Sequence, residues 1–108
     1  MEIIQLNQEL MKLYRVMNKE IEQLYEQAEI KAETERDFRK NLAQEQLKLK
    51  AEGMSVTLIP DLAKGICADL MFARDIAEDR FIATREAIQL RQVQASMLQT
   101  VIKIQREV

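Results

Sequence analysis

One short stretch divides this chain, residues 53–65, which read GMSVTLIPDLAKG. It holds both glycines and the only proline among the 108 residues. On either side run about fifty residues made largely of Leu, Glu, Gln, Lys, Ala, Arg and Met, which all have high helix propensity. A short connection makes two long helices antiparallel neighbours. The sequence therefore predicts an all-α fold, a long antiparallel helical hairpin of coiled-coil type.

The end of the first helix is marked by residue types that suit a helix C-terminus. Lys48 and Lys50 place positive charge in the last turn, where the helix dipole is negative. Gly53 can adopt the left-handed conformation that commonly follows a last turn. We therefore expect a first helix over about residues 3–52.

The start of the second helix is marked in the same way. Pro60 lacks the N–H that would be unpaired in a first helical turn, and Asp61 places negative charge at the positive end of the dipole. We expect a helix over about 60–107, a loop over 53–59 and a single domain over 1–108. The glycine at 65 lies inside this helix, which indicates close approach of a backbone or a partner.

The loop is unusually apolar for a solvated turn. It reads Met54-Ser55-Val56-Thr57-Leu58-Ile59, and we expect it to be extended. Two interpretations remain open. Its side chains either cap the core of the hairpin itself, or they bind a partner protein. The residues that would contact a partner are Met54, Val56, Leu58 and Ile59.

Two rows with seven-residue spacing follow the first helix and predict a coiled-coil-type stripe. The first row is Ile3, Leu10, Met17, Leu24, Lys31, Phe38 and Glu45. The second row is Asn7, Tyr14, Ile21, Ala28, Glu35, Leu42 and Leu49. Lys31, Glu35 and Glu45 interrupt the stripe, although Lys31 and Glu35 can pair across one turn. This interruption predicts either a solvated or kinked section or a polar layer that fixes register.

The second helix carries two apolar rows, which is more than a simple hairpin needs. One row is Phe81, Ile88, Ala95 and Ile102, extended upstream by Ala77, Leu70 and Ile66. The other is Ile76, Ala83, Leu90, Met97 and Ile104. The two rows lie roughly 140° apart around the helix axis, so packing one on the first helix leaves the other exposed. We expect the second row to form an oligomer interface, with a four-helix-bundle homodimer favoured.

Composition excludes most catalytic and metal-binding chemistry. There is no histidine and one cysteine, so neither a histidine-based triad nor a cysteine zinc site can form. Cys67 lies in an apolar helical segment and is expected to be a buried small side chain. The remaining candidate metal ligands are two groups of acids, Glu26, Glu29 and Glu33, and Asp75, Glu78 and Asp79. We expect these acids to be solvated or to pair with Arg36 and Arg39, and we expect no enzyme activity and no cofactor.

Net charge and targeting signals bound the partners and the compartment. Sixteen Lys and Arg against eighteen Asp and Glu give a net charge of −2, which does not favour non-specific DNA binding. Phosphate contacts from arginines on the second helix remain an alternative. These residues are Arg74, Arg80, Arg85 and Arg91. No stretch is apolar enough to span a membrane and the start of the chain lacks a basic leader, so we expect a cytoplasmic protein.

Several segments resemble small uncharacterised proteins encoded by phages and prophages of Gram-positive bacteria. The segments read YEQAEIKAE (25–33), RKNLA (39–43), KAEGMSVTLIPDLAKG (50–65), RDIAE (74–78) and TREAI (84–88). The likeness covers about residues 20–90 and is clearest in the loop. It implies a bacterial host cytoplasm and an accessory role in replication or recombination, and it carries no catalytic residues over.

The sequence therefore predicts a non-catalytic interaction protein, an adaptor or inhibitor, that binds a partner protein through a self-associating helical hairpin. The alternative function is that of a DNA-binding accessory protein of phage replication or recombination.

Overall fold

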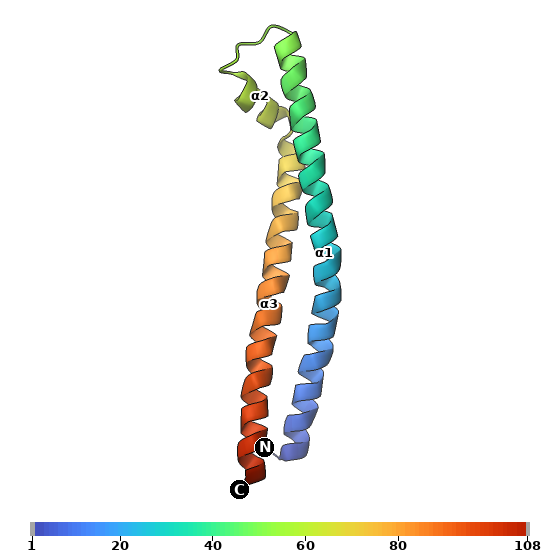
Figure 1. Cartoon of the computed structure of the whole chain (residues 1–108), viewed down its shortest axis with the longest axis vertical. Coiled ribbons are helices and arrows are strands. Elements are labelled where there is room, and N and C mark those ends of the chain that lie inside the picture. The colour runs from blue at the N-terminus through green and yellow to red at the C-terminus, as the bar shows by residue number, and fades with distance from the viewer. Residues whose placement is uncertain (1, 108) are drawn as a thin grey trace. The chain divides into compact units, whose positions relative to one another are not determined.

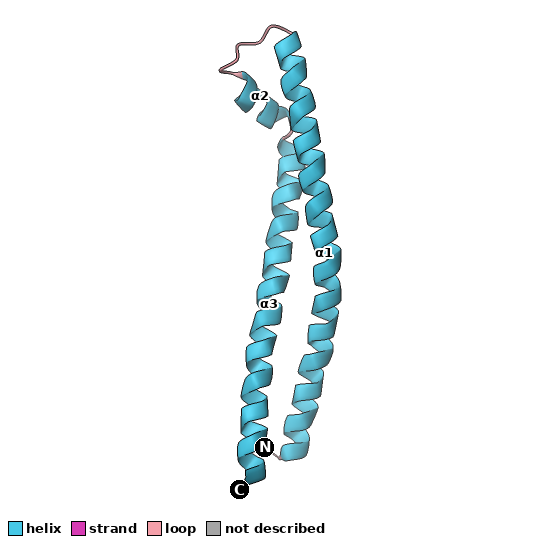
Figure 2. Ribbon diagram, viewed as in Figure 1, coloured by secondary structure: helices cyan, strands magenta, loops and turns pink. Residues whose placement is uncertain are grey.

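The computed structural model describes residues 2–107, and every regular element in this range is an α-helix (Figure 2). Helix α1 spans Ile3–Ala51, α2 spans Ile59–Ile66 and α3 spans Ala68–Glu107 (Figure 1). The predicted all-α class is confirmed. None of these helices contains an apolar stretch long enough to cross a lipid bilayer.

Helix α1 ends in a hydrogen-bonding pattern that glycine makes possible. Gly53 has a φ of 84°, in the left-handed region, as expected. Its N–H donates to the carbonyl of Lys50 at 3.1 Å, and the N–H of Met54 donates to the carbonyl of Leu49 at 3.0 Å. These two bonds form a Schellman motif, which satisfies carbonyls that the last helical turn leaves unpaired.

The loop folds into a turn, so the expectation of an extended segment is wrong. The carbonyl of Ser55 accepts hydrogen bonds from the N–H groups of Leu58, at 3.0 Å, and Ile59, at 3.2 Å. The hydroxyls of Ser55 and Thr57 lie 3.0 Å apart and share a further hydrogen bond. Serine and threonine readily form such local bonds, which compete with extended structure.

The expected second helix is divided at Cys67. This residue has φ −93° and ψ 16°, and Figure 1 shows α2 turned away from the axis of α3. Hydrogen bonds continue through the break, because the Cys67 N–H donates to Ala63 and the Cys67 carbonyl accepts from Met71, each at 3.0 Å. The Cys67 side chain is buried as predicted. It therefore lies at the junction of the two helices.

The described residues form two compact units. Unit 1 contains the described residues up to Glu26 together with those from Ile82 onward, and unit 2 contains Gln27–Phe81. Each unit is an antiparallel pair of helical segments, and unit 2 also includes the loop and α2.

In unit 1, two polar pairs fix the antiparallel alignment of α1 and α3. Gln99 donates to the hydroxyl of Tyr14 at 2.6 Å, and Arg91 donates to Glu20 at 3.1 Å. The earlier residue on α1 thus pairs with the later one on α3. The buried apolar residues of this unit are Leu6, Ile88, Ala95 and Ile102.

Unit 2 is a helical hairpin with a small apolar cluster near its loop. Leu49, Ile59 and Ala63 are buried in this cluster, and Leu42 packs against it. Three other buried side chains in the unit are Phe38, Cys67 and Ala77.

The two predicted rows of α1 are confirmed, since every member is buried or half-buried. The prediction that Ile66 belongs to the buried row of the second long helix is wrong. Ile66 is exposed because α2 ends there and the break at Cys67 stops the row from continuing. The structure also buries Leu6, which belongs to neither predicted row of α1.

Gly65 and Gly53 should respond oppositely to substitution by alanine. A Cβ at Gly65 would meet no atom within 4 Å, so the expected close approach is not found within the chain. Gly65→Ala should stabilise the protein by about 0.5–1 kcal/mol, because alanine favours a helix over glycine. Gly53→Ala should destabilise it by about 1–2 kcal/mol, because φ there is positive. Urea denaturation measures both, and a stabilising Gly53→Ala would contradict the Schellman geometry.

Candidate functional site

The loop of unit 2 exposes three of the four residues predicted to bind a partner. Val56 is 77% exposed, Leu58 is 54% exposed and Met54 is also exposed. Ile59 is only 9% exposed, because it begins α2 and packs with Leu49. Its expected role as an exposed contact is therefore corrected: Ile59 holds the loop against α1. Of the two interpretations of the loop, capping of the hairpin core therefore holds for Ile59. Val56 and Leu58 lie outside the core and are accessible to a partner.

A groove runs between the end of α1 and the start of α2. Its volume is about 480 Å³. The residues that line this tip groove are Ala43, Gln46, Leu47, Lys50, Val56, Ile59 and Pro60. Leu47 is 68% exposed, and sequence analysis missed it. The available signal was a leucine that lies outside both seven-residue rows of α1.

Helix α2 adds a second exposed apolar feature, the α2 stripe, made by Leu58, Leu62 and Ile66. These residues are four apart, so they share one side of the helix. Ile59 and Ala63 lie one position further along and are buried. One apolar side of helix α2 therefore packs against the rest of unit 2, and a neighbouring apolar side faces solvent.

In unit 2, a layer of polar side chains lies in the contact region between α1 and α3, which we call the seam. The guanidinium of Arg74 lies 4.3 Å from the centroid of the Phe38 ring and 3.7 Å from Glu35. Lys31 lies over the ring of Phe81 at 5.6 Å, while Glu35 pairs with Arg39 and Arg74. Lys31 and Glu35, which can pair across one turn, therefore make their direct contacts with other residues, and Lys31 acts on Glu35 through its charge alone. Of the two interpretations of this interruption, the contacts support the polar layer.

Glu35 is held in its charged form by this layer. The hydrogen bond from Arg39 lowers the pKa of Glu35 below its ordinary value of 4.5. Partial burial opposes the shift, while the positive charges of Arg39, Arg74 and Lys31 add to it. The ionised form of Glu35 therefore favours the folded state.

The four candidate arginines do not form one free basic surface. Arg74 is engaged by Glu35, Asp75 and Phe38, and Arg91 is engaged by Glu20. Within unit 2 only Arg80 of this set is exposed, and within unit 1 only Arg85 is exposed. Arg74 and Arg91, on which the nucleic-acid alternative also depends, are thus committed to contacts inside the units.

The acidic groups do not assemble a metal site in the part of the chain that the structure describes. No three acid or thiol side chains there lie close enough together to hold an ion. All six acids are exposed, so the expectation that they are solvated is confirmed, whereas the alternative salt bridges to Arg36 and Arg39 are not formed. Arg36 pairs with the adjacent Asp37 at 3.1 Å, and Arg39 pairs with Glu35.

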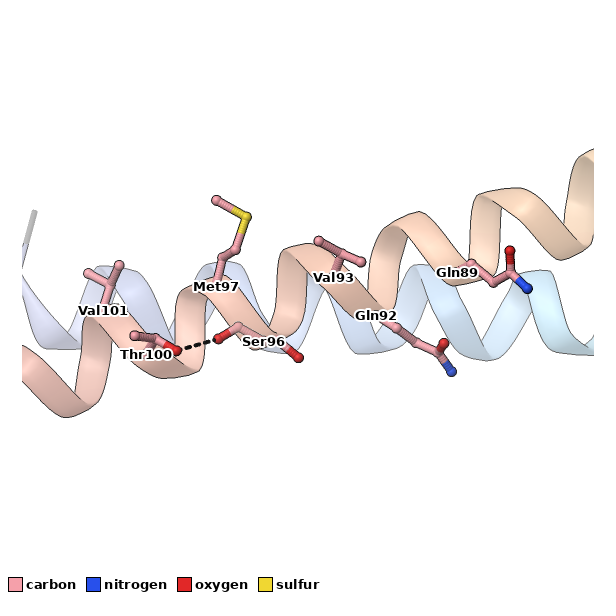
Figure 3. Close-up of a pocket in the computed structure, with 7 residues that line it drawn as sticks. All are labelled: Gln89, Gln92, Val93, Ser96, Met97, Thr100 and Val101. Carbon is pink, nitrogen blue, oxygen red and sulfur yellow. Dashed lines mark hydrogen bonds between the residues drawn. The ribbon is translucent and has the colours of Figure 1, made fainter.

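The expected oligomer row lies on the solvent side of α3. Within unit 1, Leu90, Met97 and Ile104 are each more than half exposed, and Ala83 is exposed. Ile76, in unit 2, is half-buried. Val93 and Val101 are also exposed and project from the same side of α3 as Met97 (Figure 3).

A shallow depression follows this side of α3. Its lining residues are Gln89, Gln92, Val93, Ser96, Met97, Thr100 and Val101 (Figure 3). The hydroxyl of Thr100 donates to the carbonyl of Ser96 at 3.0 Å, so that hydroxyl is satisfied within the helix. The surface consequently offers mainly apolar contacts and side-chain amides.

Comparison of the chain with protein-family models, with curated proteins and with solved structures finds no match.

Glu35→Gln should remove a pH-dependent part of the stability. Because the folded-state pKa of Glu35 is lowered, its contribution is present above the ordinary value of 4.5 and is lost as pH falls through the folded value. The gap in urea midpoint between wild type and Glu35→Gln should therefore close on acidification. Glu33→Gln, which removes an exposed acid of the same helix, is the control. An equal gap at pH 7 and pH 3 would contradict the role given to Glu35.

Proposed function

We propose that this chain is a non-catalytic interaction protein, an adaptor or inhibitor, that binds a partner protein through the tip groove of unit 2. The observation that carries the proposal is that Leu47 and Val56, both largely exposed, line one apolar groove. Large apolar side chains gathered around a groove commonly mark an interaction site. The resemblance of the loop to phage and prophage proteins supports a bacterial cytoplasmic setting.

The energetics of the tip favour a protein partner. Leaving a large apolar side chain in water forgoes roughly 1.5–3 kcal/mol relative to full burial. The α2 stripe extends the apolar surface of the same unit by Leu62 and Ile66. An amphipathic helix or an extended segment from another protein can cover such a surface with its own apolar side chains. Lys50 at the groove edge adds a positive charge that suits an acidic residue on that partner.

The tip proposal predicts that two charged substitutions abolish partner binding. A Val56→Asp/Leu58→Asp protein should lose a partner that wild type captures from bacterial host lysate, because both carboxylates would be buried unpaired. Affinity for the purified partner should fall roughly thirtyfold or more, as expected for central contacts. Ile30→Asp/Phe72→Asp is the matched control, since both residues are exposed in unit 2 outside the groove and the stripe. Unchanged affinity in the tip variant, with helicity intact, would overturn the proposal.

We propose further that the chain self-associates through the solvent side of α3, with a four-helix-bundle homodimer as the favoured assembly. The row concerned is Ile76, Ala83, Leu90, Met97 and Ile104. Its support is the exposure of Leu90, Met97 and Ile104, which α1 leaves uncovered in unit 1. Oligomerisation is the usual way to bury a second apolar stripe of a helix.

Self-association should depend on Leu90 and Met97. Wild type should sediment as a dimer, whereas Leu90→Glu/Met97→Glu should sediment as a monomer, because two charges per copy would enter the interface. Ile4→Glu/Met11→Glu is the control, because it places the same charges on exposed residues of α1 in the same unit. A wild-type monomer at high concentration would overturn self-association and would leave the tip proposal standing.

A further inference from the structure

The exposed apolar residues of α3 in unit 1 are arranged symmetrically along the helix. They are Leu90, Val93, Met97, Val101 and Ile104, which we call the outer face. Successive members are three, four, four and three residues apart, so the pattern reads the same in both directions from Met97. With about 100° of rotation per residue, all five lie within about 40° of the direction of Met97. The outer face is therefore a narrow stripe with its own midpoint.

The outer face is also free of charge along its centre. Residues 92–102 contain no acidic or basic side chain, and the run is bounded by Arg91 and Lys103. Arg91 is turned into the seam, where it pairs with Glu20. Two copies placed face to face would consequently bring no like charges together over the middle of the stripe.

We propose that two copies of the chain pair antiparallel through the outer face, with Met97 of each copy at a two-fold axis. In this register Val93 packs against Val101 of the other copy, and Leu90 packs against Ile104. A two-fold interface needs a surface that is complementary to itself, and a stripe symmetric about its midpoint meets that requirement. This inference rests on the self-association proposed above and changes its detail. The contact is made by α3 of each copy on the side opposite α1, so the paired segments lie side by side rather than in a closed four-helix bundle, and Ile76 and Ala83 lie outside the paired segment.

Charge at the end of the stripe distinguishes antiparallel from parallel pairing. Glu86 is exposed and lies in line with the outer face, one turn before Leu90. Parallel pairing would place Glu86 against the same residue of the second copy, which is a repulsive contact. Antiparallel pairing places Glu86 at the end of the paired segment, near Glu107 of the other copy, which lies about 80° from the direction of Met97 and so outside the outer face; it also opposes the two helix dipoles.

The register limits how much of α3 the pairing covers. With Met97 at the axis, residues 87–107 of one copy lie along 107–87 of the other, and all of these belong to unit 1. The pairing uses no residue of the tip groove, which belongs to unit 2. Such a dimer carries two tip grooves, one in each copy. It can therefore bind two partner molecules at once.

Cysteine cross-linking tests the register directly. Disulfide formation needs Cα atoms within about 7 Å, whereas an eight-residue offset moves a site about 12 Å along a helix. Met97→Cys should cross-link to itself on mild oxidation. Val93→Cys alone and Val101→Cys alone should remain uncross-linked, and a mixture of the two proteins should give a disulfide-linked dimer. Wild type, whose one cysteine is buried, is the control for oxidation.

The outcomes separate the two proposals. Self-cross-linking of Val93→Cys and of Val101→Cys, without mixed dimers, would show parallel pairing and would overturn the register while self-association stands. Absence of any cross-link from a protein that sediments as a dimer would show that another surface pairs, and would also overturn it. A monomeric wild type would overturn both the register and self-association. Circular dichroism of each variant establishes that the helices are intact.

Discussion

A pair of helices can hide only one stripe of each helix, and this limit governs the rest of the molecule. Helix α1 keeps its two seven-residue rows buried or half-buried at every position, and the apolar side chains that it exposes, such as Ile4, Met11 and Leu47, lie outside these rows. Helix α3 exceeds the limit, because its inward row, with Ile88, Ala95 and Ile102, leaves a second apolar row on the opposite side. The exposure of Leu90 and Met97 follows from geometry, since no rotation of α3 can bury both rows against α1 alone.

The seam also accepts polar side chains, and their contacts show how it keeps its alignment. Arg74 covers Phe38 while contacting Glu35, so one arginine joins an aromatic ring and a carboxylate of the opposite helix. Partly exposed ion pairs add little to stability. Their value lies in specificity, because a shifted register would separate Arg74 from both Glu35 and the ring of Phe38, leaving each only its partners on its own helix. Glu20 and Arg91 make an equivalent contact in unit 1.

The periodic features were predictable from the sequence, and the local irregularities were not. The two rows of α1, one through Phe38 and the other through Leu49, follow from a constant seven-residue interval, and Gly53 supplies the conformation that ends α1. The break at Cys67 has no comparable signal, because residues on both sides have ordinary helix propensity apart from Gly65. Leu47 and Leu62 of the candidate site were missed because their exposure depends on where α2 packs, which no local pattern specifies.

The turn that joins α1 to α2 has a consequence for how the chain folds. It encloses only a few residues between hydrogen-bonded ends, whereas the polar pairs of unit 1 join residues 71 and 85 positions apart. The entropy lost on closing a loop grows with its length, so contacts beside the turn form at the lowest cost. Once they have formed, the later pairs close progressively shorter gaps. Contact order therefore favours zipping from the turn toward the two termini, with Tyr14 and Gln99 joining late.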